Sequence, residues 1–514
     1  MLQIQNISFR DYILSLFQCV VSDGLCKSNI SLILHRLKPA VSQVSFMQYS
    51  LLYILLFAAT VVFFAGCAVT TPYQRPAQLP VEGLFRVFAD TDTTHSLATR
   101  SVIDFYNDPL LQQLITEALD SNLNVRSAVN RLSQMSELVL QRQAAFYPNL
   151  TLGLNGSISD VSKYGNSIKP ADPLTRLQLS ATAGWEVDVW GKLSSLKRSQ
   201  QAAYFQQEAT LRAVQTQLVA SVASSYYQLI MLDHQRAITE KNIDSYTRYL
   251  NTVKLLKQSA QVTEVAVLQA NAQLAAAQAV LPQLNASIAI EENYLCLLLG
   301  KTPEAISRSQ NYDLTLFHPE SFSIGIPVQL LVNRPDVQAA EYALCASHEQ
   351  FNAARAALYP QLTLSGAIGP DAKGLENWFN LPGSLFWNVV GGLTQPVLNG
   401  RTLKTQKEIA RLQEDAAYLS FKQTLLNAGN EVSNALASIR FASQRATFQQ
   451  EQVGALKKAY EYSQELLVNG YATYLDVLSA QNNVLSSELA LYSTYNSIIQ
   501  QKIILFRALG GGWR

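Results

Sequence analysis

The amino-acid sequence predicts an α+β membrane protein in which one unit of very long helices and short strands occurs twice. Three observations support this fold class: a segment that returns 212 residues later, helical stretches too long for a globular core, and four stretches in which apolar and polar residues alternate. Charged residues make up only 15% of the 514 residues, whereas soluble domains usually contain about 25%. Neutral side chains must therefore cover much of the surface.

The charge balance and the motif content exclude several classes of function. The chain has 39 basic and 38 acidic residues, a net charge of +1, and so offers no field that would attract nucleic acid. The five cysteines and five histidines show no metal-ligand spacing. No GxSxG, phosphate loop or HExxH motif occurs. We therefore predict no enzyme activity, no cofactor, no metal site and no nucleic-acid partner.

A targeting signal is predicted near the N-terminus. Residues 51–66 are uninterrupted apolar or small residues that run into Cys67. This stretch is shorter than the roughly 20 residues of a membrane-spanning helix and matches the apolar region of a signal peptide. The small pair before Cys67 resembles the lipobox of bacterial lipoproteins, in which the cysteine is acylated after cleavage. We expect residues 1–66 to be a leader, with Met47 as a possible start, and Cys67 to be the lipidation site. The alternative is an N-terminal anchor helix.

The duplication is visible in four matched segments. AAFYPNLTL at 144–152 returns as AALYPQLTL at 356–364, with seven of nine residues identical. VLQA at 267–270 returns as VLSA at 477–480, and two further segments repeat with nearly the same offset. Chance similarity would not give several matches in order, so the chain is a tandem duplication.

These matches define the expected organisation along the chain. A lipidated tether at 67–103 is followed by a first repeat at 104–300. An inter-repeat segment at 301–326 then leads to a second repeat at 327–514.

Within the first repeat, the helical period gives way to a period of two. Asp108 and Pro109 provide an N-cap and a first-turn proline for a helix, and a second helix leads to Pro148. Alternation then predicts strands at about 149–157 and 176–190, joined by a loop at 156–175. The second repeat gives strands near 361–368 and 385–397, with Gly369-Pro370 expected in the loop between them.

A very long helix follows the second strand of each repeat. A helix from about 194 to 258 would be on the order of 100 Å long. Such a rod cannot lie inside a globular core. The returning helix near the C-terminus carries apolar residues, including Leu475 and Leu478, at coiled-coil spacing. The long helices are therefore expected to form walls.

Four strands per chain cannot close a barrel, and open strand edges in lipid would leave backbone groups unpaired. Two chains would give eight strands and a filled interior. Three chains would give twelve strands and room for a pore, which the polar alternate face favours. The alternative is a soluble antiparallel sheet with one solvated face.

Several longer motifs carry a family resemblance. RPDVQAAE at 334–341, NAARAALYPQLTLSG at 352–366, WEVDVWGKL at 185–193 and the C-terminal ALGGGW at 508–513 extend over most of the mature region. Together they resemble the outer-membrane factor family, the TolC-like and OprM-like (NodT-type) exit ducts of bacterial tripartite efflux pumps, in its lipoprotein branch.

The resemblance implies an architecture, partners and a location. The expected assembly is a homotrimer with a 12-stranded β-barrel in the outer membrane and a 12-helix periplasmic tunnel, with 301–326 in an equatorial belt. The expected partners are a periplasmic adaptor (membrane fusion) protein, an inner-membrane pump of the RND type and outer-membrane lipid. The expected function is a passive exit duct for drugs or other small toxic compounds. A duct for protein secretion and a non-conducting coiled-coil lipoprotein remain alternatives.

The resemblance also implies a periplasmic gate. Family members carry acidic residues just after the turn of the long helices, and Asp476 matches that position. The first-repeat counterpart is Ala266, so Glu264 is the substitute there. We expect packing of Leu475 and Leu478 to hold the gate closed while Asp476 acts as a charge filter. The alternative role for Asp476 is a helix N-terminal residue favoured by the helix dipole.

Overall fold

The computed structural model describes residues 69–77, 79, 84, 102–159, 174–309, 333–373 and 376–512. The predicted leader and Cys67 lie outside these residues, as do most of the predicted tether and of the inter-repeat segment. The chain divides into two units, Met1–Ala68 and Val69–Arg514. All the described residues belong to the second unit.

The two repeats have matching elements. The first contains α4 (Val102–Phe105), α5 (Pro109–Ser121), α6 (Leu123–Ala144), β1 (Asn149–Ser159), β2 (Leu174–Val187), α7 (Lys192–Gln258) and α8 (Glu264–Leu298). The second contains α10 (Pro335–Ala356), β3 (Gln361–Lys373), β4 (Leu385–Thr394), α11 (Thr402–Val468) and α12 (Tyr474–Ala508). The long helices α7 and α11 have 67 residues each, and the returning helices α8 and α12 have 35 each. The predicted duplication is thus present in the fold.

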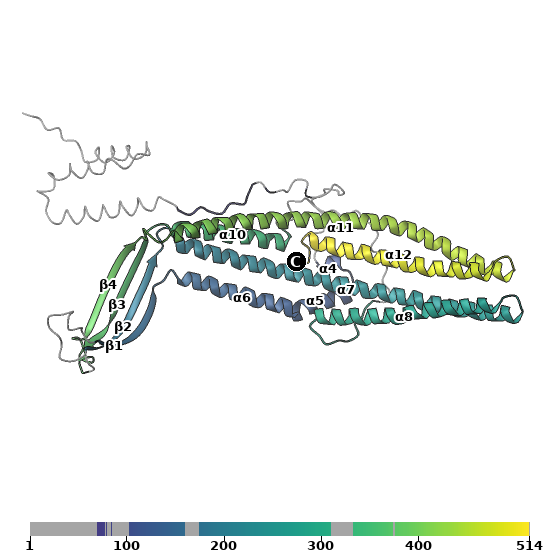
Figure 1. The fold of residues 1–514 in the computed structure, drawn as a ribbon, viewed down its shortest axis with the longest axis horizontal. Helices are drawn as coiled ribbons and strands as arrows, with labels where there is room; N and C mark the ends of the chain where they lie inside the picture. The colour runs from purple at the N-terminus through teal and green to yellow at the C-terminus, as the bar shows by residue number, and fades with distance from the viewer. Residues whose placement is uncertain are drawn as a thin grey trace, which may run out of the picture. The chain divides into compact units, whose positions relative to one another are not determined.

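The long helices determine how the elements are arranged. The sheet lies at one end of α7 and α11, and the turns to α8 and α12 lie at the other (Figure 1). Helices α6 and α10 lie along the sheet-side halves of the long helices, while α8 and α12 lie along the far halves (Figure 1). Shorter helices therefore accompany both halves of each long helix. The far halves form two helical hairpins, α7/α8 and α11/α12.

Local sequence explains where the first helices begin. The Asp108 carboxylate accepts a hydrogen bond of 2.9 Å from the Leu110 N–H, and Pro109 occupies the first turn of α5. Asn122 ends α5 and caps α6 by accepting from the Asn124 N–H at 2.8 Å. The predicted N-terminal signal of the first helix is confirmed.

The strands form one antiparallel sheet in the order β1-β2-β3-β4. Strands β1 and β3 extend beyond their predicted ends, so 156–159 is strand and not loop. Gly369-Pro370 also lies inside β3, contrary to the predicted loop. Gly369 passes so close to β2 that a Cβ would lie 1.9 Å from the Leu179 carbonyl oxygen. The glycine therefore permits a close strand approach and does not mark a turn.

The second strand of each repeat ends earlier than predicted. Strand β2 stops at Val187 and β4 at Thr394. The alternation continues past Val187, but the Asp188 carboxylate accepts hydrogen bonds from the Leu193 and Ser194 N–H groups, at 2.9 and 2.8 Å. These bonds satisfy backbone N–H groups in the first turn of α7 that have no partner within the helix. The chain therefore leaves the sheet at this point and begins the helix.

Candidate functional site

The sheet has one exposed apolar face. The strand register places Leu152 opposite Ala181, Ala181 opposite Ile368, and Ile368 opposite Trp387, so these side chains share a face. The other face carries mainly polar or small side chains, such as Thr151 and its partner Thr182. The large exposed residues of the apolar face include Leu150, Leu152, Leu154, Ile158, Trp185, Leu364, Ile368, Leu385, Trp387, Val389 and Leu393. This face has the chemistry of a surface that contacts lipid or another protein.

The sheet also has two open edges. Strand β1 pairs only with β2, and β4 pairs only with β3, among the strands of the described residues. Each edge presents a row of backbone donors and acceptors that needs a partner strand.

A row of exposed leucines along α11 forms a further unpaired surface. Leu412, Leu419 and Leu426 recur every seven residues and are exposed. This spacing is typical of a coiled-coil seam, because seven residues return the side chain to nearly the same face of a helix. No helix of the described chain covers these three side chains, which leaves them available to a second chain.

The two helical hairpins meet near their turns in an apolar cluster, here called the tip cluster. Two hydrogen bonds join α7 to α12 there: the Tyr249 hydroxyl donates to the Tyr474 carbonyl oxygen at 2.5 Å, and the Tyr246 hydroxyl donates to the Asn482 side-chain oxygen. The hairpins are therefore tied by both apolar packing and polar contacts. The buried members of the tip cluster are Tyr246, Tyr249, Leu250, Val253, Ala266, Ala270, Ala277, Val477 and Leu478.

The structure separates the four predicted gate residues. Leu478 is 7% exposed within the tip cluster, whereas Leu475 is 48% exposed. Asp476 is exposed and forms a capping box with Thr473, whose N–H and hydroxyl donate to its carboxylate at 2.8 and 2.7 Å. These hydrogen bonds hold the pKa of Asp476 below its usual value. Glu264 forms an ion pair with Lys257 of its own hairpin.

Sequence reasoning missed the tyrosines that join the hairpins. Tyr246 and Tyr249 are three residues apart and therefore lie on one face of α7. That spacing is a visible signal, but the sequence does not reveal that their hydroxyls meet α12.

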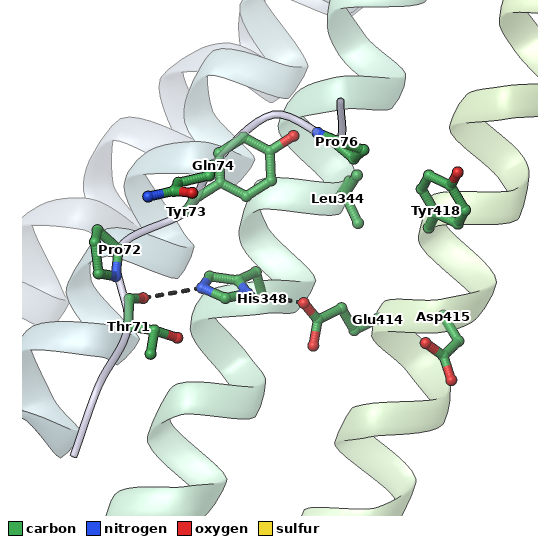
Figure 2. A pocket seen from close by; sticks show the side chains of 10 residues that line it. All are labelled: Thr71, Pro72, Tyr73, Gln74, Pro76, Leu344, His348, Glu414, Asp415 and Tyr418. Carbon is green, nitrogen blue, oxygen red and sulfur yellow. Dashed lines mark hydrogen bonds and ion pairs between the residues drawn. The ribbon is translucent and has the colours of Figure 1, made fainter. Parts of the chain in front are cut away.

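An N-terminal strap, residues 69–77, lies along α10 and α11. The two ring nitrogens of His348 approach the Thr71 carbonyl oxygen at 2.9 Å and the Glu414 carboxylate at 2.7 Å, as Figure 2 shows. Arg75 forms two hydrogen bonds with the Glu341 carboxylate, of 2.6 and 2.7 Å. Between the strap and α11 lies an open groove of about 570 Å³, lined in part by Thr71, His348 and Glu414 (Figure 2). The strap is thus held by specific polar contacts.

The start of the strap lies near the junction of sheet and helices. Gly191 caps the N-terminus of α7 with a φ of 77°, and a Cβ there would lie 3.2 Å from the Thr70 side chain. Val69, directly before Thr70, is buried.

The described residues contain no group of three or more side chains arranged to hold a metal ion. None of their helices is both long enough and apolar enough to cross a membrane.

Comparison with known proteins gives a consistent result. The sequence model of a family described as outer membrane efflux protein matches residues 114–301 and 326–511. The chain is 28% identical over 458 residues to the solvent efflux pump outer membrane protein SrpC of Pseudomonas putida, covering 87% of this chain and 96% of that protein. It is 27% identical over 466 residues to the probable outer membrane lipoprotein SilC of Salmonella typhimurium, covering 89% and 98%.

A solved structure shows the same fold. The outer-membrane channel OprN superposes with a TM-score of 0.79 at 26% identity, covering 87% of this chain and all of that one. The family model matches both repeats and omits only the segment between them and the two ends of the chain. The chain belongs to the outer membrane efflux protein family and is an outer-membrane duct of an efflux system.

Proposed function

We propose that three copies of the chain form a closed 12-stranded barrel in the outer membrane, continued by a 12-helix tunnel in the periplasm. The four-stranded sheet carries this proposal, because it combines an apolar outer face with two open edges. Unpaired edge groups cost several kcal/mol each in lipid, and pairing β1 of one copy with β4 of the next removes both edges. Twelve strands leave a pore lined by the polar face.

The unpaired seam on α11 supports the helical part of this assembly. Leu412, Leu419 and Leu426 would pack against a helix of the neighbouring copy, as in a coiled coil. We expect Leu419→Asp to weaken the trimer strongly, because it places a charge in that seam. Leu268→Asp, at another exposed leucine near the hairpin turn, is the control. The mass of the detergent-extracted particle measures the effect, and an unchanged trimer mass for Leu419→Asp contradicts this seam.

The strap supports lipidation at Cys67. Thr70 packs beside Gly191 at the junction of sheet and helices, and Cys67 is only three residues earlier, or about 10 Å of extended chain. An acyl chain on Cys67 would then reach the membrane that holds the barrel. Cys67→Ser should lose the label of a palmitate analogue, whereas Cys345→Ser should keep it. Label retained on the Cys67→Ser variant contradicts the assignment.

We place the periplasmic gate at the ends of the hairpins. In a trimer the exposed Asp476 carboxylates would face a common axis and attract cations. Glu264 would add a weaker acidic ring, since Lys257 partly cancels its charge. Asp476→Ala should reduce cation selectivity and divalent-cation block more than Glu264→Ala does. Single-channel recordings test this, and unchanged selectivity in Asp476→Ala would leave the carboxylate only its capping role.

The duct would work with a periplasmic adaptor and an inner-membrane pump of the RND type, which supplies the energy. Small toxic compounds are the proposed cargo, since the relative SrpC is named for solvent efflux. Planar bilayers containing the extracted protein provide the decisive test. Conductance supports the duct, and its absence in wild type and in a gate variant such as Leu478→Ser contradicts it.

A further inference from the structure

We infer that Gln481 destabilises the contact between the two hairpins and thereby favours their separation. Gln481 lies on α12 and is only 1% exposed. Neither polar atom of its amide has a hydrogen-bond partner among the described residues, although both are buried. Among the described residues no other side chain leaves two polar atoms in this condition.

The position of Gln481 is one that normally takes an apolar residue. It lies one turn after Val477 and Leu478 and one turn before Leu485, all of which belong to or pack against the tip cluster. The spacing of three or four residues puts the amide on the same face of α12. A polar group in a helical seam lowers stability while it sets how the helices associate.

The other buried polar side chains of α12 differ from Gln481. The Ser487 and Thr494 hydroxyls donate to backbone carbonyl oxygens of their own helix, at 2.9 and 3.1 Å. The neighbouring Asn482 accepts from the Tyr246 hydroxyl across the hairpin contact. Polar groups on α12 can therefore form hydrogen bonds within this packing, whereas the amide of Gln481 forms none with the described residues.

An unpaired buried amide favours the separated hairpins over the packed ones. In the packed arrangement it has lost its hydrogen bonds to water without replacing them, and it regains them when the hairpins part. The contact is thus held by Tyr246, Tyr249 and the apolar cluster, while Gln481 opposes it. The inference rests on the proposed gate for its meaning in transport, but the packing itself can be tested without transport.

Two adjacent substitutions provide a matched test. Gln481→Met keeps an unbranched side chain of similar length and removes the unpaired amide, whereas Asn482→Leu removes a paired amide and leaves the Tyr246 hydroxyl alone. Hydrogen exchange of residues 474–490 in the full-length trimer measures opening of the contact. We expect Gln481→Met to slow exchange by about tenfold and Asn482→Leu to accelerate it.

Faster or unchanged exchange in Gln481→Met, and in Gln481→Leu as a second variant, overturns the inference, because the amide must then be satisfied. Single-channel recording gives a separate measurement, in which Gln481→Met should shorten open times. If neither wild type nor Leu478→Ser conducts, the proposed duct fails while hydrogen exchange still decides the role of Gln481.

Discussion

The two helical hairpins descend from one repeated unit, yet their ends are built differently. At the turn, Ala260 of the first hairpin has a φ of 55° where Gly470 of the second has 77°. At the start of the returning helix, Thr263 makes no side-chain cap, whereas Thr473 forms a capping box with Asp476. The second hairpin therefore has the turn residue and the cap that local stability favours.

The repeats also differ in which side chains they bury. Leu268 and Leu478 occupy equivalent positions of the matched segments VLQA and VLSA. Leu268 is 60% exposed, whereas Leu478 is 7% exposed in the tip cluster. The two similar backbones thus bury different side chains at equivalent positions. Single substitutions at paired positions can measure each difference.

The largest expected effect is at the paired leucines. Leu478→Ser should destabilise the hairpin contact by about 3 kcal/mol, because it removes a packed side chain and buries a hydroxyl. Leu268→Ser should change stability by no more than about 0.5 kcal/mol. Thermal unfolding of the detergent-extracted protein compares them, and equal losses would show that the burial difference has no energetic consequence.

The turn residues should give the next effect. Gly470→Ala should cost about 1 to 2 kcal/mol, because a side chain at positive φ is strained. A Cβ there meets nothing within 4 Å in the described part of the chain, so the expected cost is that of the backbone. Ala260→Gly should relieve the same strain in the first hairpin. Thermal unfolding of the two variants tests the pair, and a loss in Ala260→Gly would contradict the strain argument.

A smaller effect is expected at the helix caps. Thr473→Ala should cost about 1 kcal/mol, since it removes the side chain that caps α12. Thr263→Ala should cost less, because Thr263 makes no side-chain cap hydrogen bond. Hydrogen exchange at the first turns of α8 and α12 measures both. Similar fraying of the two helices after substitution would argue against the capping box.

The smallest effect concerns pH. Hydrogen bonds from Thr473 lower the pKa of Asp476, so the charged carboxylate is favoured in the folded helix. Its stabilisation is fully present above the ordinary aspartate pKa of about 3.9 and is lost as pH falls through the lowered value. Acidification through the lowered pKa of Asp476 should therefore fray the first turn of α12, whereas Ala266 at the equivalent position of α8 makes no such contribution. In Thr473→Ala the fraying of the first turn of α12 should begin at higher pH. Amide hydrogen exchange in that turn measures it, with the rates compared after correction for the pH dependence of intrinsic exchange.

The sequence by itself determined the repeat, the order of helices and strands, and the family. Periodicity predicted these elements because a face that packs must recur every 3.6 residues in a helix and every two in a strand. Asp108 was identified as a cap for the same local reason. Strand ends were less accurate, since Asp188 begins α7 before the alternation of β2 stops. The predicted loop at Gly369 is wrong, because the close approach of Gly369 to Leu179 involves a strand distant in the sequence.

Only the tertiary structure decided which residues join the hairpins. Leu475 and Leu478 are both leucines and lie three residues apart in the sequence. The rotation of α12 against α7 nevertheless buries Leu478 and exposes Leu475. The contacts of Tyr246 and Tyr249 join residues more than 220 positions apart. Periodicity can indicate that a face is buried, but it cannot identify the partner, because that depends on how separate helices are placed in space.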